Sequence, residues 1–464
     1  MITAPEAIAD ESLAADGLAC PRCDTPLRTA DVGLACPACQ IDFPQLDGVP
    51  FLFAEPRAAL GEWRSRLNLE FQRLNQDARQ LGDALQAHDL HPLTRQRLQM
   101  LQDASRQHRL SLEELMAPLI GEPTRTGLET YLALRTRLPS DQGLNTYYNN
   151  IHRDWAWGDE ENRRACELVA SMLGDPARGS RVLILGAGGC RLAYDLHMNR
   201  DHERTVALDF NPLLLLLAAR LIRGERIQLH EFPIAPRNIE SGAVLRELAA
   251  PAPARDGLEL ILGDALRPPF PAGSFDAVVT PWLVDILPMD FKDLALRINT
   301  LLKPGGRWVN FGSLVFTHAD AKLRYSLEET LQLVEDAGFG PADCREDEIP
   351  YMCSPASRHQ RQERMVSFAA TKQQDTPPQP RHSALPEWLV TGQEPVPVLP
   401  SFQMQAASTR IYAFVMGMID GRRSIRDMAE QMEKQRLMTR DEAEPAIRSF
   451  LIKMHEDSQR GLLR

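Results

Sequence analysis

Four cysteines near the start of the sequence are spaced as metal ligands. Cys20 and Cys23 form one Cys-x-x-Cys pair, and Cys36 and Cys39 form a second. Each pair places two thiolates on a tight turn, and two such turns complete the tetrahedral sulfur shell that Zn²⁺ prefers. Four cysteine ligands leave no open position on the metal, so the pattern predicts a structural zinc, with a redox dithiol as the alternative. Metal binding would supply the folding energy of so short a segment.

A glycine loop followed by two acids indicates a site for a nucleotide-like cofactor. Gly186 and Gly188 lie where a short apolar run breaks off, and they let the backbone turn sharply and approach a ligand. Asp209 ends a second apolar run roughly 20 residues later, the spacing at which such folds bind a ribose. A third run ends in Asp264, next to Ala265, and both are candidate cofactor contacts.

The elements that must hold these residues alternate between strand and helix. Short apolar runs bounded by glycine are typical of buried parallel strands. A helix with a capping-box start at Ser326 and Glu329 follows them, and then a closing antiparallel hairpin is expected. The predicted strands are 181–185, 206–209, 258–264, 275–280 and, after a Lys-Pro-Gly-Gly turn, the end of 301–312, with the hairpin at 343–351 and 364–371.

This order of strands, glycine loop and acids resembles the fold of S-adenosylmethionine (SAM)-dependent methyltransferases, a Rossmann-like α/β sheet. The resemblance implies SAM as the cofactor, with Asp209 on the ribose and Asp264 near the adenine. A nicotinamide dinucleotide site is the alternative for the glycine loop alone. It is disfavoured because the loop lacks the third glycine of Gly-x-Gly-x-x-Gly.

Length and composition favour a cytoplasmic protein of several domains. A chain of 464 residues is too long for one compact core. No apolar run approaches the ~20 residues of a membrane span, and the start of the chain lacks the features of a secretory signal. The net charge of −11 argues against a nucleic-acid partner. The expected domains are a zinc ribbon (1–56), a helical region (57–145), a methyltransferase domain (146–372), a proline-rich linker (373–400) and a small helical or winged-helix domain (401–464).

Two segments outside the predicted sheet are expected to surround it. Residues 57 to about 140 carry apolar side chains at helical spacing, which predicts a bundle or a lid, with His91 and His108 at its surface. The insertion 225–257 is long and contains prolines. It is expected either to cover the substrate pocket or to form a surface loop.

The two ends of the chain resemble known small modules. The stretch 41–53 resembles the zinc-ribbon activator proteins of tRNA methyltransferases, which implies an interaction module that stabilises a methyltransferase, here within one chain. RNA binding is not expected, because residues 1–56 contain nine acids and two arginines. Residues 408–464 resemble the peptide chaperone of pyrroloquinoline quinone biosynthesis, which implies a peptide or protein partner. A helical bundle or a homodimerisation module is the alternative.

An aromatic-rich segment, Tyr147–Gly158, precedes the first predicted strand of the sheet. Its Arg153 offers a bidentate clamp for a carboxylate, and the methionine part of SAM carries one. The alternative is a helix whose aromatic residues pack on the sheet while Arg153 pairs with Asp154.

This segment, together with the glycine loop and the stretches 280–286, 302–314 and 325–329, resembles the carnosine N-methyltransferase family over residues 146–372. In that family a glutamine and an arginine before the sheet bind the cofactor, and the matching positions are Asn150 and Arg153. The ribose acid is usually a glutamate there, and it is Asp209 in this chain.

The resemblance also implies an acceptor site. The family uses an aspartate after the fourth strand, which matches Asp285, and a histidine after the fifth. Thr317 stands at the matching place and His318 lies one position later. Trp282 is expected to form an apolar wall, and Tyr351 is a further pocket candidate. The alternatives are a helix N-cap or an Arg153 partner for Asp285, and a surface position for His318.

These features together predict a SAM-dependent N-methyltransferase that acts on a small imidazole-containing or peptide-like acceptor. An imidazole needs only one nitrogen made nucleophilic, and Asp285 can accept a hydrogen bond from the other. One alternative is a methyltransferase that modifies a ribosomally made peptide. A non-catalytic scaffold that uses the ribbon and the tail to organise partners is the other.

Overall fold

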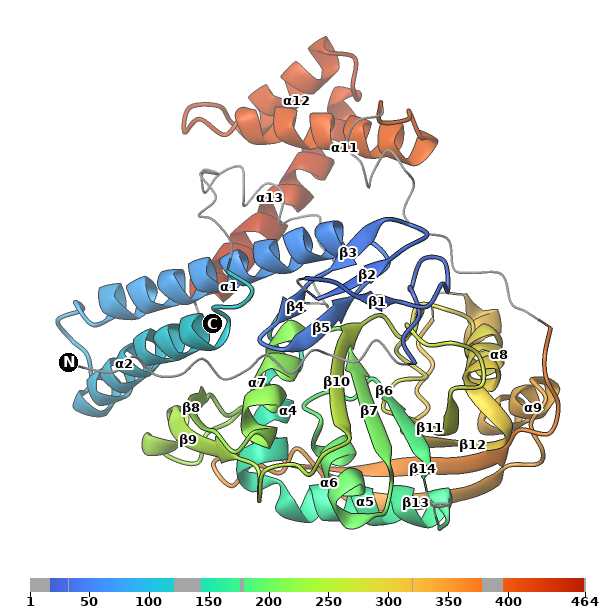
Figure 1. Cartoon of the computed structure of the whole chain (residues 1–464). Coiled ribbons are helices and arrows are strands. Elements are labelled where there is room, and N and C mark those ends of the chain that lie inside the picture. Colours follow the sequence, from blue (N-terminus) through green and yellow to red (C-terminus); the bar gives the residue numbers. More distant parts are fainter. Residues whose placement is uncertain are drawn as a thin grey trace. The chain divides into compact units, whose positions relative to one another are not determined.

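A computed structural model of the chain describes residues 17–31, 33–120, 143–175, 179–318, 320–377 and 395–462 (Figure 1). The chain divides into two compact units, Met1–Ala384 and Leu385–Arg464. The first holds a nine-stranded sheet with the order β13-β14-β12-β11-β6-β7-β10-β5-β4. Among the described residues, no helix combines the length and the apolar character needed to cross a membrane.

The centre of the sheet is parallel, as the glycine-bounded apolar runs predict. The β-hairpin that closes one side runs antiparallel to it, with β14 paired to β12. The strands are β6 (Arg181–Leu185), β7 (Arg204–Asp209), β10 (Leu258–Gly263), β11 (Phe275–Pro281), β12 (Leu302–Gly312), β13 (Asp343–Tyr351) and β14 (Arg361–Thr371).

Each central strand is buried on both faces because its side chains alternate between two cores. In β6, Val182 and Ile184 belong to one hydrophobic core, and Leu183 and Leu185 belong to the other. The helices of the first core include α5 (Asp159–Leu173), α6 (Arg191–Asn199) and α7 (Pro212–Ile222), and those of the second include α8 (Phe291–Leu301) and α9 (Leu327–Asp336). The predicted capping box starts α9, with Ser326 and Glu329 bonded reciprocally.

The cysteine-bearing ribbon is connected to the large sheet of the first unit by the two strands that follow it. Its small antiparallel sheet consists of β1 (Arg28–Thr29), β2 (Leu34–Cys36) and β3 (Ile41–Phe43). The chain then turns through β4 (Gln45–Leu46) into β5 (Val49–Leu52). Strand β5 pairs in parallel with β10, with Leu52 opposite Gly263. The predicted ribbon domain therefore joins the large sheet through β5 and β4, whereas the strands beside its cysteines form a sheet of their own.

Residues 57–120 of the helical region form a pair of long helices, α1 (Pro56–Ala84) and α2 (Pro92–Leu115), and residues 121–142 lie outside the described residues. The insertion forms a separate hairpin of β8 (Arg226–Glu231) and β9 (Val244–Ala249), with a short 3₁₀ turn at Glu240–Gly242. The hairpin packs against α2 and α7, so the insertion is not a free surface loop.

The loop after β8 is bonded to residues 354–358 at the end of β13. Ser354 donates to the carboxylate of Glu231, and Arg237 N donates to Ala356 O at 3.1 Å. The insertion therefore braces the segment that follows Tyr351.

The second unit is helical where the structure describes it. Helices α11 (Pro400–Gly417), α12 (Ile425–Lys434) and α13 (Arg440–Leu462) share a small apolar core that includes Val415, Met428 and Ile447. Residues 395–462 contain no strand, so the wing of a winged-helix domain is absent from this part. Most of the predicted linker, 378–394, lies outside the described residues.

Candidate cofactor and acceptor site

The glycine loop follows β6 at the carboxyl end of the sheet. Gly186 and Gly188 have φ values of +72° and +56°, which L side chains rarely adopt. A Cβ on Gly186 would lie 2.8 Å from Leu283 Cδ1, whereas one on Gly188 would meet nothing within 4 Å. Gly186 therefore permits close packing, and Gly188 borders open space where a ligand can approach.

Asp209 lies directly beside this loop at the end of β7. Its Oδ2 accepts a hydrogen bond from Gly188 N at 2.8 Å, and its Oδ1 accepts one from Asn211 N at 2.9 Å. Burial raises the pKa of this carboxyl to about 6, although the backbone donors favour its charged form. The loop and the acid thus form one site, with a buried carboxylate that can accept further hydrogen bonds.

Asp264 lies at the same edge of the sheet, on the neighbouring strand. Asp209 pairs with Leu262 in the β7–β10 register, so Asp264 stands two residues beyond that level. Its Oδ1 accepts from Leu266 N at 2.8 Å, and it is half-buried, while Ala265 is buried. Ala265 belongs to the hydrophobic core that also contains Cys20 of the ribbon.

The aromatic-rich segment is a short helix, α4 (Tyr148–His152), that widens into one π-helical turn, Arg153–Trp157. In that turn Gly158 N donates to Arg153 O at 2.9 Å, five residues back. Single π turns inside helices often mark functional sites. Asn150 lies on α4, three residues before Arg153, and is half-buried.

Arg153 pairs with Asp154, as the packing alternative predicted. Its Nε and Nη2 lie 2.8 and 2.6 Å from Asp154 Oδ1, and the side chain of Asp154 is 4% exposed. A Cβ on Gly189 would lie only 2.4 Å from Asp154 Oδ2, so this oxygen occupies the space that a side chain at position 189 would need. Trp155 Nε1 donates to Gly189 O at 2.8 Å. The π turn is therefore fixed onto the glycine loop, which brings Arg153 to the predicted cofactor site.

Asp285 connects two loops at the carboxyl ends of β11 and β12. Its Oδ2 accepts from Val315 N at 2.7 Å and from Ser313 Oγ at 3.3 Å. The structure shows neither the N-cap nor the Arg153 pairing that were the alternatives for this residue. Asp285 is half-buried, so it holds the loop after β12 while part of the side chain stays accessible.

His318 lies on the same loop as Val315 but is exposed. Its Nδ1 accepts from Asp320 N at 3.0 Å, and its carbonyl oxygen accepts from Arg324 Nε at 2.7 Å. These local bonds form a turn before the short 3₁₀ helix Ala321–Leu323. The structure therefore places His318 at the surface and shows no contact with Asp285.

Tyr351 contacts both a residue predicted for the cofactor site and one predicted for the acceptor site. Its ring lies 4.6 Å from that of Trp282, centroid to centroid, and the Arg153 guanidinium carbon lies 5.8 Å from it. Arg361 is not among the residues predicted for the site, yet its guanidinium carbon lies 4.7 Å from the Tyr351 ring. The pairing of β13 with β14 is the feature from which Arg361 could have been found, because its register places Tyr351 opposite Arg361.

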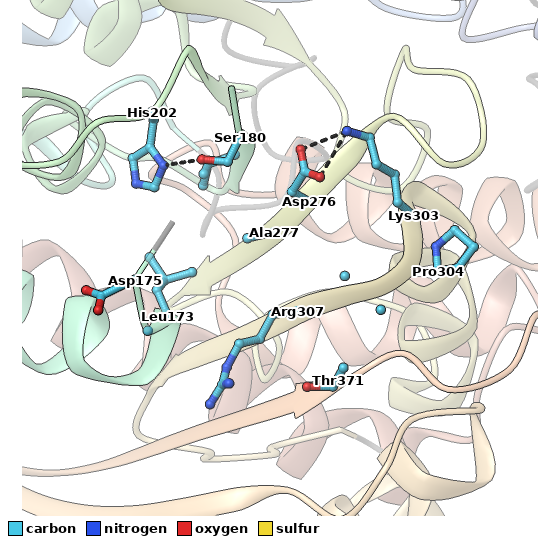
Figure 2. Close-up of a pocket in the computed structure, with 14 residues that line it drawn as sticks. Leu173, Asp175, Ser180, His202, Asp276, Ala277, Lys303, Pro304, Arg307 and Thr371 are labelled. Atoms are coloured by element: carbon cyan, nitrogen blue, oxygen red, sulfur yellow. Dashed lines mark hydrogen bonds and ion pairs between the residues drawn. The ribbon is translucent and has the colours of Figure 1, made fainter. Parts of the chain in front are cut away.

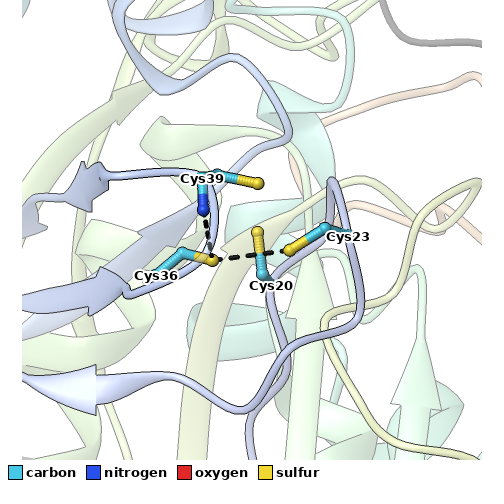
Figure 3. Close-up of side chains that lie close together, drawn as sticks. All are labelled: Cys20, Cys23, Cys36 and Cys39. Atoms are coloured by element: carbon cyan, nitrogen blue, oxygen red, sulfur yellow. Dashed lines mark hydrogen bonds between the residues drawn. The ribbon is translucent and has the colours of Figure 1, made fainter.

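The four ribbon cysteines come together as predicted. Their sulfur atoms all lie within 4.8 Å of one another. Figure 3 shows the four side chains gathered at one place. A tetrahedral Zn–S₄ centre needs sulfurs about 3.8 Å apart, so the set fits zinc after small adjustments. Cys39 N and Arg22 N donate to the sulfurs of Cys36 and Cys20 at 3.3 and 3.4 Å, which stabilises thiolates. Burial raises the pKa of the Cys39 thiol to about 11, so a bound cation would be needed to keep that thiol deprotonated.

A buried polar cluster lies beside the π turn, where α2, α4 and β8 meet. Tyr148 Oη donates to His230 O at 2.6 Å, and the Tyr148 ring contacts the rings of His108 and His152. The expectation that His108 lies at the surface was wrong, because the insertion hairpin covers that face of α2 and leaves His108 2% exposed. Burial lowers the pKa of His108 to about 4 and that of His152 to about 3, and positive neighbours add to the shift.

A cavity of about 310 Å³ lies at the opposite end of the strands (Figure 2). It is lined by residues at the start of β6 and β11, and by the Lys-Pro-Gly-Gly turn. Inside it, Lys303 Nζ lies 2.8 Å from Asp276 Oδ2, and Ser180 Oγ lies 3.0 Å from His202 Nδ1. The glycine loop stands at the other end of β6, so this cavity is separate from the predicted cofactor site.

The parallel sheet, its antiparallel closing hairpin and the loop-bound acid define a Rossmann-like domain of the methyltransferase class. The family model for carnosine N-methyltransferase matches residues 140–374. The chain therefore belongs to the carnosine N-methyltransferase family.

Individual relatives are more distant. The carnosine N-methyltransferase of Dictyostelium discoideum is 27% identical over 173 residues, which cover 33% of this chain and 36% of that protein. The chain thus aligns with about a third of the length of this curated relative.

Two solved structures are also similar. A complex of the Haloferax volcanii Trm112 methyltransferase activator with a methyltransferase is 17% identical, with a TM-score of 0.34 over 49% of this chain and 96% of that one. Phosphoethanolamine N-methyltransferase 2 of Haemonchus contortus is 14% identical, with a TM-score of 0.34 over 51% and 58%.

Proposed function

We propose that the chain is a cytoplasmic SAM-dependent N-methyltransferase that acts on a small, carnosine-like imidazole acceptor. The family to which it belongs supports the reaction class. The observation that carries the proposal is the hydrogen bond from Gly188 to Asp209 at the carboxyl ends of β6 and β7, with the Arg153–Asp154 pair packed onto the same glycine loop. Open α/β sheets bind their ligands at that position.

The residues around the glycine loop suit the parts of SAM. Arg153 is proposed to bind the methionine carboxylate, with Asn150 one turn away on the same short helix. Asp209 is proposed to accept the ribose hydroxyls, because it is a buried carboxylate beside the loop. Asp264 and Ala265 are proposed to border the adenine.

The acceptor would lie between the loops that follow β11 and β12. Trp282 and Tyr351 form an aromatic wall there, and Asp285 is the acidic group. We propose that Asp285 accepts a hydrogen bond from one imidazole nitrogen, so that the lone pair of the other faces the methyl group. We assign His318 to the rim of the acceptor site, because it is exposed on the loop that Asp285 holds through Val315.

The cofactor supplies an electrophilic methyl group on a positively charged sulfur. The protein aligns the acceptor nitrogen with the methyl carbon and sulfur, and it excludes water. With SAM bound, its methyl group would pass to the acceptor nitrogen and leave the sulfur neutral, and Asp285, hydrogen-bonded to the other imidazole nitrogen, would accept the proton released there. A neutral imidazole needs no strong base, which agrees with the absence of a catalytic triad from the site as described.

The remaining parts are proposed to support this domain. Zinc in the ribbon is structural and holds β5 against β10. We propose residues 57–145 as a cover beside the site and 401–464 as a module for a peptide or protein partner, or for assembly with a second copy.

Two measurements test the proposal. Isothermal titration calorimetry should show one SAM site per chain. Incubation of the zinc-loaded protein with carnosine and SAM should give a product heavier by one methyl group, by mass spectrometry. SAM binding without methylation of any imidazole acceptor would refute the assigned acceptor class, and the absence of SAM binding would refute the enzyme class.

A further inference from the structure

Arg361 stands at the aromatic wall without a role in the mechanism above. Its guanidinium carbon lies 4.7 Å from the Tyr351 ring, and Tyr351 in turn contacts Trp282. Stacking on an aromatic face restrains a guanidinium while leaving its donors at the edge available. The β13–β14 register, which pairs Tyr351 with Arg361, fixes this placement in the backbone.

The two arginines at Tyr351 differ in what holds them. Arg153 is almost buried and is bonded through two nitrogens to Asp154, beside the glycine loop. Arg361 is 51% exposed, and its ion pair with Glu363 is made through Nε at 3.3 Å. An exposed pair of this kind contributes little, so Arg361 can exchange it for a ligand at small cost.

A carboxylate is the group that such a cation recognises. A guanidinium binds a carboxylate through two parallel hydrogen bonds, and the planar imidazole of the acceptor suits the aromatic wall beside it. We propose that Arg361 binds the carboxylate of the acceptor, so that the site selects imidazoles that carry a carboxylate over simple imidazole amines. This inference rests on the proposed function, and it adds the feature by which the acceptor is chosen.

The test compares two acceptors that differ only in this group. These are β-alanyl-L-histidine and its decarboxylated analogue, β-alanylhistamine. Arg361→Gln should raise KM for the dipeptide about tenfold, the effect of one lost charged hydrogen bond at a half-exposed position, while kcat and KM for the amine stay unchanged. Arg361→Lys keeps the charge but not the fork, so its KM should fall between wild type and Arg361→Gln.

Arg364 offers a matched control on the same strand. It stands three residues further, so it projects from the opposite face, where it pairs with Glu348 at 3.0 Å. Arg364→Gln should leave KM for both acceptors unchanged. An equal rise of KM for both acceptors in Arg361→Gln, or no rise for the dipeptide, would overturn the inference while the proposed function stands. If the wild-type enzyme methylates neither acceptor, the proposed function fails and the inference fails with it.

Discussion

The buried histidine cluster should make the fold sensitive to mild acid. Lowering the pH from 7 to 5 protonates histidines in the unfolded chain, where the ordinary pKa is 6.5. In the folded protein His108 and His152 stay neutral, because burial holds their pKa values near 4 and 3. The contribution of the two neutral histidines to the free energy of unfolding is therefore fully present above pH 6.5. It is lost as the pH falls toward their pKa values in the folded protein.

The size of the loss follows from these pKa values. At pH 5 each histidine favours the unfolded chain by about 2 kcal/mol, so the two together remove about 4 kcal/mol. Asp209 acts in the opposite direction, since its folded pKa is raised to about 6 and its protonation then favours the folded state. The other charged groups that shift the pKa values of these two histidines are Arg73, His230 and Arg246.

A variant separates the histidine effect from these other contributions. His152→Leu removes one titrating ring and keeps an apolar side chain in a site that is 0% exposed. Urea unfolding at pH 7, 6 and 5, followed by circular dichroism, gives the free energy of unfolding of both proteins. Between pH 7 and 5 the wild type should lose about 2 kcal/mol more than the variant. Parallel pH dependences in the two proteins would refute the reasoning, because Asp209 and all surface groups are common to both.

Four substitutions test the assigned sites. Cys36→Ser should lose the single zinc by metal analysis and lower the melting temperature, and an unchanged zinc content would exclude the four-cysteine centre. Asp209→Ala should weaken SAM binding by about 2 kcal/mol in calorimetry, because a buried charged acceptor is lost; unchanged affinity would mean that the ribose lies elsewhere. Arg153→Lys keeps the charge but loses the guanidinium fork proposed to bind the SAM carboxylate, so it should bind SAM more weakly at a near-normal melting temperature, whereas a stability loss alone would favour a packing role. Asp285→Asn should keep SAM affinity and lower kcat/KM by the equivalent of about 1.5–3 kcal/mol of transition-state stabilisation, and full activity would remove this residue from the acceptor site.

The features that local sequence determines were predicted correctly. The capping box that starts α9 and the run that becomes β6 depend on neighbouring residues, and each has the same pattern in the structure. The gathering of the four ribbon cysteines was predictable for the same reason, because two tight turns need only short-range spacing.

Contacts between distant segments could not be predicted in this way. Nothing near Val49–Leu52 in the sequence shows that this strand pairs with β10, some 200 residues further on. The prediction that His108 lies at the surface was wrong because the hairpin that covers it belongs to the 225–257 insertion, which is distant in the sequence. Arg361 is an ordinary charged residue until the register of its hairpin places it on Tyr351.

The pairing of β5 with β10 also determines how this sheet assembles. Because β5 belongs to the same polypeptide, it meets β10 in an intramolecular step, at an effective concentration that is on the order of millimolar for tethered partners. Dilution therefore cannot separate the two, and a second ribbon supplied in solution would have to reach a comparable concentration to displace the first. The edge of β10 thus stays covered at any protein concentration, and its pairing does not depend on the abundance of a separate partner.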